Sequence, residues 1–564
     1  MRRSTSLALA AIVLAAVAIR LSPLLSALYW GSDFGEYFGI LRTLVATGTM
    51  PSHYLGWGST YPFFPGMFFV QDGVVRLGAV DLPTVLNLVV PVLGALAVVP
   101  IFLVGIEVTG DRRVALFAAA FLAGAMPHAY PTSHAAPATL GDLLAFATLL
   151  LFLRIGKDGR MAIPLGLTTL ALVATHHLGA YFLILMVLAT IILRGFVRPL
   201  EWTASLKREV AYAGFLLAVT FAYWLGYATA FRENILTDVN IQPWWLLLAA
   251  FPILLAAVAG VLALRRRIAW RFRPHYPDFH RSSTMYGFAL AFVLGLMGLT
   301  VLDAIPGTGI ALPASTFAYF APFLVLVAFS AAGRKFFDFL RAGIGPSAWF
   351  LALSASAILG TVVATRVLIP YRHVEYLVVP VALLAGTGFV RLLDLSGAVR
   401  GRRGAVVALC GALLIGNFAM AIPPPNFVAN WNEGTMPRSL DGAYWARDHM
   451  SGLTLADHRV STTLFGFAGV NATWDTTTTP FFAPDFAQAM GGLVNVAAPS
   501  GRGNVSYVWV DADEIAGVQL RPWEPAVPMP AATVAMLSNY PFVKVFDTGY
   551  SQVYWIAWGC DPSC

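Results

Sequence analysis

The sequence predicts a polytopic α-helical membrane protein that ends in an extracytoplasmic α/β domain. Hydrophobic residues make up 58% of the chain and charged residues only 12%, about half the charged share of a typical soluble domain. Apolar runs of roughly 20 residues, the length that crosses a bilayer, recur up to residue 422. After residue 422 charged residues, Pro, Asn and Thr become frequent, and no run is long enough to span. The chain therefore divides into a transmembrane domain, 1–422, and a C-terminal domain, 423–564.

About thirteen transmembrane helices are predicted. They cover residues 7–28, 84–106, 113–130, 137–154, 161–176, 178–196, 210–230, 244–264, 285–304, 314–332, 347–366, 374–392 and 405–422. Loops rich in Lys and Arg alternate with loops that have few, as at Arg112, Lys207 and Arg402. Because basic loops stay on the cytoplasmic side, the N-terminus is predicted inside and the C-terminal domain outside a cell membrane. The basic residues are scattered between the apolar runs, which argues against a nucleic-acid partner.

Short patterns in the C-terminal domain predict its elements. "DGAYWARDHM" predicts an amphipathic helix, "LTLADHR" a buried strand and "SYVWVDAD" an alternating strand. "FVKVFDTGYSQVYWIAW" predicts a hairpin that turns at Asp547, Thr548 and Gly549. These patterns together indicate a small α/β domain.

The first outer loop, residues 29–83, is long and rich in aromatic residues and Pro, and such loops usually have a function. Residues 62–80 within it predict an interfacial or re-entrant helix. Asp33 and Glu36 open the loop and allow two interpretations. They are either catalytic carboxylates or a capping box that starts a helix over 34–47.

Further polar groups are predicted on the same membrane face. Asp142 lies about one turn inside the fourth span, where inserting an unpaired carboxylate costs free energy. Three neighbouring loops contain basic groups. Arg372 and Arg366 stand outside against the charge bias, and Arg suits bidentate phosphate recognition. Snorkelling or pairing with Glu375 is the alternative for these two. The set also contains His128, His134, His176, His177, Arg232, Glu233 and His373.

These residues resemble the GT-C glycosyltransferases, polytopic enzymes that use polyprenyl-phosphate-linked sugars and include oligosaccharyltransferase catalytic subunits and protein mannosyltransferases. The resemblance rests on "GSDFGEYF" after the first span, on "TYPFFPG", on Asp142, and on "YRHVEYLVVPVALL", which is similar to an arginine-bearing late helix. The oligosaccharyltransferase tail motif Trp-Trp-Asp-Tyr-Gly is absent, and Asp142 has no paired carboxylate in sequence. These departures favour transfer of a monosaccharide.

The resemblance implies a role for each candidate. Asp33 would take the proton of the acceptor hydroxyl, and Glu36 would orient the acceptor. A divalent cation, Mg²⁺ or Mn²⁺, would be held by Asp33 or Glu36 with Asp142. Arg372, helped by Arg366 or His373, would neutralise the lipid phosphate, and the sugar carbon would invert. Weaker substrate or metal candidates are His134, His176 and His177, and Asp457 and His458 would contribute acceptor recognition from the C-terminal domain.

Other functions stay open at this point. An oligosaccharyltransferase would transfer a whole glycan to protein, and the acceptor here could be a protein, a lipid or a glycan. A transporter or flippase for lipid-linked glycans would place helix breaks and charges near the bilayer midplane and would show an internal repeat, and no repeat is obvious. A polysaccharide polymerase or ligase would depend less on the acidic pair of the first loop.

Overall fold

The computed structural model describes most of both predicted domains. The described residues are 3–52, 54–197, 203–239, 311–337, 344–362, 368–397, 401–483, 485–498, 501–521 and 524–559. The predicted spans 244–264 and 285–304 and the candidate Arg366 lie outside these residues. The number of thirteen spans therefore stays a prediction.

Each predicted span within the described residues coincides with helical structure. The helices are α1 (Arg3–Leu21), α4 (Leu82–Thr84), α5 (Val90–Leu96), α6 (Val98–Thr109), α7 (Arg112–Gly124), α8 (Met126–Ala129), α9 (Pro137–Ile155), α10 (Ala162–Val173), α11 (His177–Val197), α12 (Ala204–Ala222), α16 (Ala314–Tyr319), α17 (Ala321–Phe337), α18 (Ile344–Val362), α20 (His373–Ser396) and α21 (Arg402–Ala419). Within the described part of the chain, seven helical segments are long and apolar enough to cross a membrane. An eighth results if α7 and the segment Met126–Ser133, bent by 64° relative to it, form one span.

The helix α20 lies at the centre of the bundle. About 83% of its apolar window is buried, compared with 17% for α1. It packs against α7, α17 and α18, and its buried side chains, such as Leu383 and Leu384, belong to the largest hydrophobic cluster. A helix that is apolar all round is stable only when other helices or lipid surround it. The first turn of α20 is buried as well, since His373, Glu375 and Tyr376 are at most 4% exposed.

The C-terminal domain has the predicted α/β architecture. Its sheet has the strand order β3-β6-β8-β7, with β3 (Leu453–Leu455) parallel to β6 (Val505–Asp511) and with β8 (Ser551–Ile556) antiparallel to both β6 and β7 (Phe542–Asp547). Alternate residues of β6 face opposite layers, since Val508 and Val510 join one apolar cluster and Trp509 another. The predicted hairpin and the helix α22 (Pro437–His449) are confirmed. The remaining elements are α23 (His458–Thr463), α24 (Phe486–Gly492), β4 (Val496–Ala498), β5 (Gly501–Gly503), α25 (Ala512–Ala516) and α26 (Ala531–Met536).

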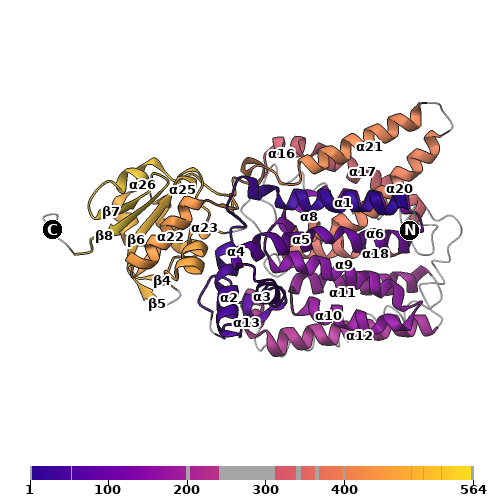
Figure 1. Ribbon diagram of the computed structural model, residues 1–564, viewed down its shortest axis with the longest axis horizontal. Helices are drawn as coiled ribbons and strands as arrows, with labels where there is room; N and C mark the ends of the chain where they lie inside the picture. Colours follow the sequence, from indigo (N-terminus) through magenta and orange to yellow (C-terminus); the bar gives the residue numbers. More distant parts are fainter. Residues whose placement is uncertain are drawn as a thin grey trace.

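The first outer loop lies between the bundle and the C-terminal domain (Figure 1). It contains α2 (Phe34–Thr47), with the bounds predicted, and α3 (Gly66–Gly78), which corresponds to the predicted interfacial helix. Near them lies α13 (Thr229–Val239). The strand β1 (Tyr29–Trp30) pairs with β2 (Gly434–Thr435), the segment that leads into the C-terminal domain. The helix α2 also contacts α23, so the loop is fixed from both sides.

Candidate active site

A cavity of about 840 Å³ lies where the end of the bundle meets the first loop and the C-terminal domain. Five of the predicted site residues line it, namely Asp33, His134, His176, His177 and Arg372. The first loop supplies one wall, through Trp30 to Phe34, Tyr37, Trp57 to Tyr61, and Phe64. The rest comes from the segment before α9, the turn before α11, Asn234 of α13, the residues that lead into α20, and Arg521 and Glu524 of the C-terminal domain. Segments far apart in sequence thus meet in one hollow.

Asp33 precedes α2, but its side chain does not cap that helix. Its Oδ1 lies 2.6 Å from Nε2 of His458, and its Oδ2 accepts hydrogen bonds from the hydroxyls of Tyr61 and Tyr37 at 3.3 and 3.4 Å. The capping-box interpretation is therefore wrong: the imidazole of another domain and two phenols hold the carboxylate instead. Burial alone would raise the pKa of Asp33, but the hydrogen bond and charge of His458 outweigh it and hold the pKa below its ordinary value. Asp33 is thus an anion at neutral pH.

Glu36 points away from the cavity and is completely buried. Its Oε1 accepts a hydrogen bond of 2.6 Å from the backbone N–H of Gly58, and it is not among the residues that line the cavity. Burial raises the pKa of Glu36 to about 7. The side chain braces the segment from Trp57 to Tyr61, which carries part of the cavity wall, rather than reaching the site itself.

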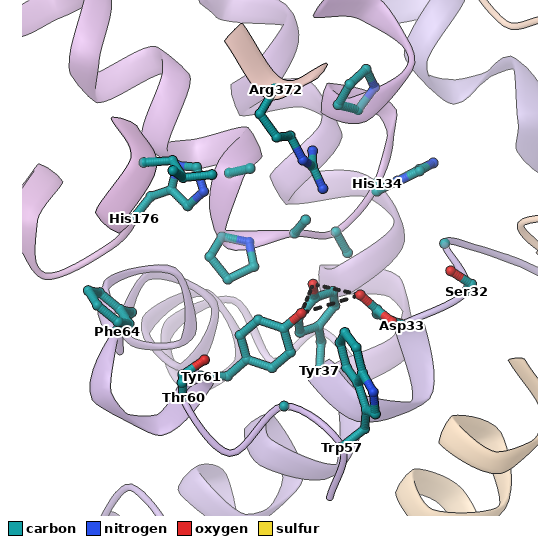
Figure 2. A pocket seen from close by; sticks show the side chains of 18 of the residues that line it. Ser32, Asp33, Tyr37, Trp57, Thr60, Tyr61, Phe64, His134, His176 and Arg372 are labelled. Atoms are coloured by element: carbon teal, nitrogen blue, oxygen red, sulfur yellow. Dashed lines mark hydrogen bonds between the residues drawn. The ribbon is translucent and has the colours of Figure 1, made fainter. Parts of the chain in front are cut away.

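Arg372 lies opposite Asp33. Its guanidinium points into the cavity toward the cluster of Asp33, Tyr37 and Tyr61 (Figure 2). Its side chain is 38% exposed, and its Nη1 is 3.9 Å from Oε2 of Glu375, which is too long for a hydrogen bond. Glu375 therefore does not take up the donors of Arg372 in hydrogen bonds, and the guanidinium, which also lies over the ring of Tyr371 at 5.6 Å, can meet an anionic ligand in the cavity.

Three histidines complete the polar lining. Nε2 of His134 is 3.9 Å from Oε1 of Glu433, and burial lowers the pKa of His134, with the positive charge of Arg372 acting in the same direction. Nδ1 of His176 accepts a hydrogen bond from the N–H of Gly179 at 3.2 Å. His177 packs against aromatic rings of the first loop and α13. Neutral imidazoles at these positions can donate or accept hydrogen bonds from sugar hydroxyls.

Besides Glu36, two predicted site residues of the helical bundle do not reach the cavity. Nε2 of His373 is 2.8 Å from the hydroxyl of Ser356, and the ring is completely buried. Asp142 is also completely buried and accepts a hydrogen bond of 2.6 Å from the hydroxyl of Tyr376.

Asp142 belongs to a buried polar chain that runs toward α1. Its Oδ2 is 3.5 Å from Nε2 of His128, and Nδ1 of His128 is 2.9 Å from a guanidinium nitrogen of Arg20, which is 1% exposed. None of these three residues lines the cavity that contains Asp33.

The donor set does not fit a divalent cation shared by Asp33 or Glu36 with Asp142. The three carboxylates have separate partners, and Asp33 alone lines the cavity. In the part of the chain that the structure describes, no three His, Cys, Asp or Glu residues are grouped so that they could hold a metal ion.

Of the two candidates in the C-terminal domain, His458 reaches the site and Asp457 supports it from behind. Asp457 caps α23 through the N–H of Val460 at 2.9 Å and also accepts a hydrogen bond from the N–H of Gln519. Tyr37, Trp57, Tyr61, Arg521 and Glu524 also line the cavity and were not predicted as site residues. Tyr37 lies in "GSDFGEYF" and Tyr61 in "TYPFFPG", so these two motifs contained a signal for the two tyrosines.

No model of a known protein family matches the sequence, and no curated protein matches it. Among solved structures, the chain is similar to the oligosaccharyltransferase of Archaeoglobus fulgidus in complex with zinc and sulfate. The TM-score is 0.55 at 14% identity, over 90% of this chain and 68% of that chain. The chain also aligns with ArnT of Cupriavidus metallidurans in the apo state, with a TM-score of 0.48 at 15% identity over 97% of each chain. The alignment with the arabinofuranosyltransferase AftD from Mycobacteria has a TM-score of 0.49 at 14% identity, over 98% of this chain and 41% of that chain.

The likeness to the oligosaccharyltransferase establishes the fold. It covers 90% of this chain and therefore extends over both the helical bundle and the C-terminal α/β domain. The chain is a multi-pass membrane protein with the GT-C fold.

Proposed function

We propose that this protein is a membrane glycosyltransferase that moves a sugar from a polyprenyl-phosphate-linked donor to an acceptor hydroxyl on the extracytoplasmic side. The observation that carries the proposal is the shared cavity. The carboxylate of Asp33 and the guanidinium of Arg372 come from opposite walls and face the same space of about 840 Å³. A base and an anion-binding group on opposite sides are what direct displacement at a sugar carbon requires.

In the proposed reaction the acceptor oxygen attacks C1 of the sugar from the side of Asp33. The bond between C1 and the phosphate oxygen breaks, and its electron pair leaves with the polyprenyl phosphate. Asp33 takes the proton of the acceptor hydroxyl, and Arg372 stabilises the charge that develops on the phosphate. Because attack and departure occur on opposite faces, the configuration at C1 inverts. Phosphate is a stable anion at neutral pH, so one carboxylate suffices, unlike the acid and base pair of glycoside hydrolysis.

The position of Glu36, Asp142 and His373 changes their proposed roles. Glu36 supports the loop segment that forms one wall of the cavity. Asp142 and His373 support the bundle near α20. The histidines at 134, 176 and 177 line the cavity and are proposed to bind sugar hydroxyls. The acceptor is a protein, a lipid or a glycan, and an assay with acceptors of all three kinds distinguishes them.

The carboxylate is tested by Asp33→Asn in purified protein reconstituted into nanodiscs. The assay supplies short-chain polyprenyl-phosphoryl monosaccharides with a panel of peptide, glycolipid and oligosaccharide acceptors. We expect Asp33→Asn to lower transfer by a factor of at least about 100, within the range for loss of a general base. Asp81→Asn is the matched control, because Asp81 caps α4 at the far end of the same loop and Asn caps a helix equally well. Transfer at the wild-type rate by Asp33→Asn would refute the proposal.

The guanidinium is tested by binding of undecaprenyl phosphate and of undecaprenol, which lacks the phosphate. The wild type should prefer the phosphate, and Arg372→Ala should lose about 10- to 100-fold of that preference, the equivalent of one hydrogen bond to a charged group. Arg391→Ala, an exposed residue of the same helix, should keep it. Equal preferences in the two variants would remove Arg372 from the phosphate site.

Oligosaccharyltransferase activity is the second candidate, because the neighbour that establishes the fold is an oligosaccharyltransferase. It predicts transfer of a lipid-linked oligosaccharide to a peptide that contains Asn-X-Thr. The monosaccharide proposal predicts that this donor and acceptor pair gives no product while a monosaccharide donor does. The same reconstituted protein distinguishes the two.

A further inference from the structure

Three contacts from the C-terminal domain and its leading segment converge on two consecutive residues of the first loop. The backbone N–H of Ser32 donates to Oε2 of Glu433 at 2.6 Å, and the carbonyl of Ser32 accepts from the hydroxyl of Thr462 at 2.7 Å. His458 then meets the carboxylate of Asp33 at 2.6 Å. Backbone and side chain of the acidic motif are thus both set from residues more than 400 positions later in the chain.

We infer that His458 is a positioning residue for the base, so that the C-terminal domain completes the catalytic centre and does not serve acceptor recognition alone. This inference rests on the function proposed above. The imidazole engages Oδ1 of Asp33 and leaves Oδ2 on the side of the tyrosine hydroxyls. The carboxylate is thereby held with Oδ2 beside the hydroxyls of Tyr37 and Tyr61 on the wall of the cavity (Figure 2).

The surroundings of His458 keep its ring in place. The side chain is completely buried, and the rings of Trp57 and Trp431 lie 4.8 and 6.2 Å from it, centroid to centroid. Its backbone N–H donates to the carbonyl of Gln519 at 2.7 Å. A residue this enclosed loses little side-chain entropy when it binds its partner, which suits it to orient a catalytic group.

A second layer of buried charge holds α23 itself. Arg459 donates to both carboxylate oxygens of Asp511 at 2.9 and 2.7 Å. Glu514 accepts hydrogen bonds from the N–H groups of Asp457 and Asp511, each at 2.8 Å. The start of α23 is therefore fixed by ion pairs and hydrogen bonds on one side while His458 faces the first loop on the other.

His458 also has a chemical effect on the base. Without the imidazole, burial would raise the pKa of Asp33, and a protonated carboxyl could not accept the acceptor proton. The titratable and charged groups that face Asp33 are His458 of α23, Tyr61 of the same loop, His134 of the segment before α9, Arg372 across the cavity, and Tyr37 and Glu36 of α2. Among these, His458 is the group in direct contact with Oδ1.

The test compares His458→Ala with His458→Gln in the reconstituted full-length protein. His458→Ala should lower kcat by about 10- to 100-fold near neutral pH and move the acid limb of the pH profile upward by about one unit or more, with the KM for the donor within about twofold of wild type. His458→Gln keeps an N–H donor and should restore the acid limb and part of kcat. His449→Ala, an exposed histidine of α22, is the matched control and should behave as wild type.

Three results would overturn the inference. One is an unchanged acid limb in His458→Ala, and another is a raised donor KM with unchanged kcat. The third is equal loss in His458→Ala and His458→Gln, which would indicate a structural role. Thermal unfolding shows whether His458→Ala folds. If it does not, the pH profile of His458→Gln is the test, and an upward shift of its acid limb by one unit or more would contradict the inference. Failure of Asp33→Asn to abolish transfer would instead reject the proposed function, so the two failures are distinguishable.

Discussion

The contact between α2 and α23 offers a test that removes no polar group. A Cβ atom added at Gly35 would lie 2.2 Å from the carbonyl oxygen of Thr462, where an ordinary contact needs about 3.4 Å. The neighbouring atoms are backbone on both sides, so the two helices must separate. Asp33 and His458, at the start of these same helices, are 2.6 Å apart, and a separation of that size would break their hydrogen bond.

Gly35→Ala should therefore reduce transfer about as strongly as His458→Ala and lower the free energy of unfolding by about 1–3 kcal/mol through overpacking. The matched control is Gly73→Ala in α3, where an added Cβ meets nothing within 4 Å and the helix gains roughly 0.5–1 kcal/mol. Both variants are measured by thermal unfolding and by transfer in nanodiscs. Full transfer by Gly35→Ala with an unchanged unfolding midpoint would show that the two helices need not touch for catalysis.

Two further predictions concern buried charges. Burial raises the pKa of Glu36 from 4.5 to about 7, so between these pH values the folded protein keeps a proton that the unfolded chain releases. The contribution of Glu36 to the free energy of unfolding is therefore full below pH 4.5 and falls by about 3 kcal/mol as the pH rises through 7. Glu36→Gln should lack this loss, and equal midpoints of wild type and variant at both pH 5 and pH 8 would contradict it. Arg459→Leu should destabilise the C-terminal domain by about 3–5 kcal/mol, since it leaves the carboxylate of Asp511 buried without its partner. The exposed Arg447→Leu should leave the unfolding midpoint unchanged, and equal midpoints for the two Arg variants would refute this reasoning.

The alternation of loops between the two sides of the membrane made it predictable that Asp33 and Arg372 lie at the same end of the bundle. When spans are counted and basic loops are assigned to one side, both residues fall at the same end of the bundle, and a carboxylate and a guanidinium at one end are candidates for one site. Local signals also predicted α2 with its bounds and the C-terminal hairpin with its turn. These features depend on local pattern, which the sequence contains.

The direction of each side chain was not predictable in the same way. Arg372 and His373 are consecutive at the start of a helix, so their side chains point about 100° apart, and only one can face the cavity. Asp33 and Glu36 have the spacing of a capping box, yet Asp33 contacts the imidazole of His458, 425 positions later in the chain, instead of capping α2. No local pattern indicates that His458 docks there, since this contact depends on how two domains pack.

The buried guanidinium of Arg20 has a consequence for how the bundle assembles. Its donors are satisfied by Thr132, His128 and two backbone carbonyls, at 2.9 to 3.2 Å, and the first two partners are synthesised more than 100 residues after α1. Until they arrive, the side chain must extend to the headgroups, because a charge within the bilayer is expensive. Only 17% of the apolar window of α1 is buried, so these hydrogen bonds add to the apolar packing of α1 against α5 and α7. Arg20 in the first helix therefore gains its buried partners only when the segment that leads to His134 has entered the membrane.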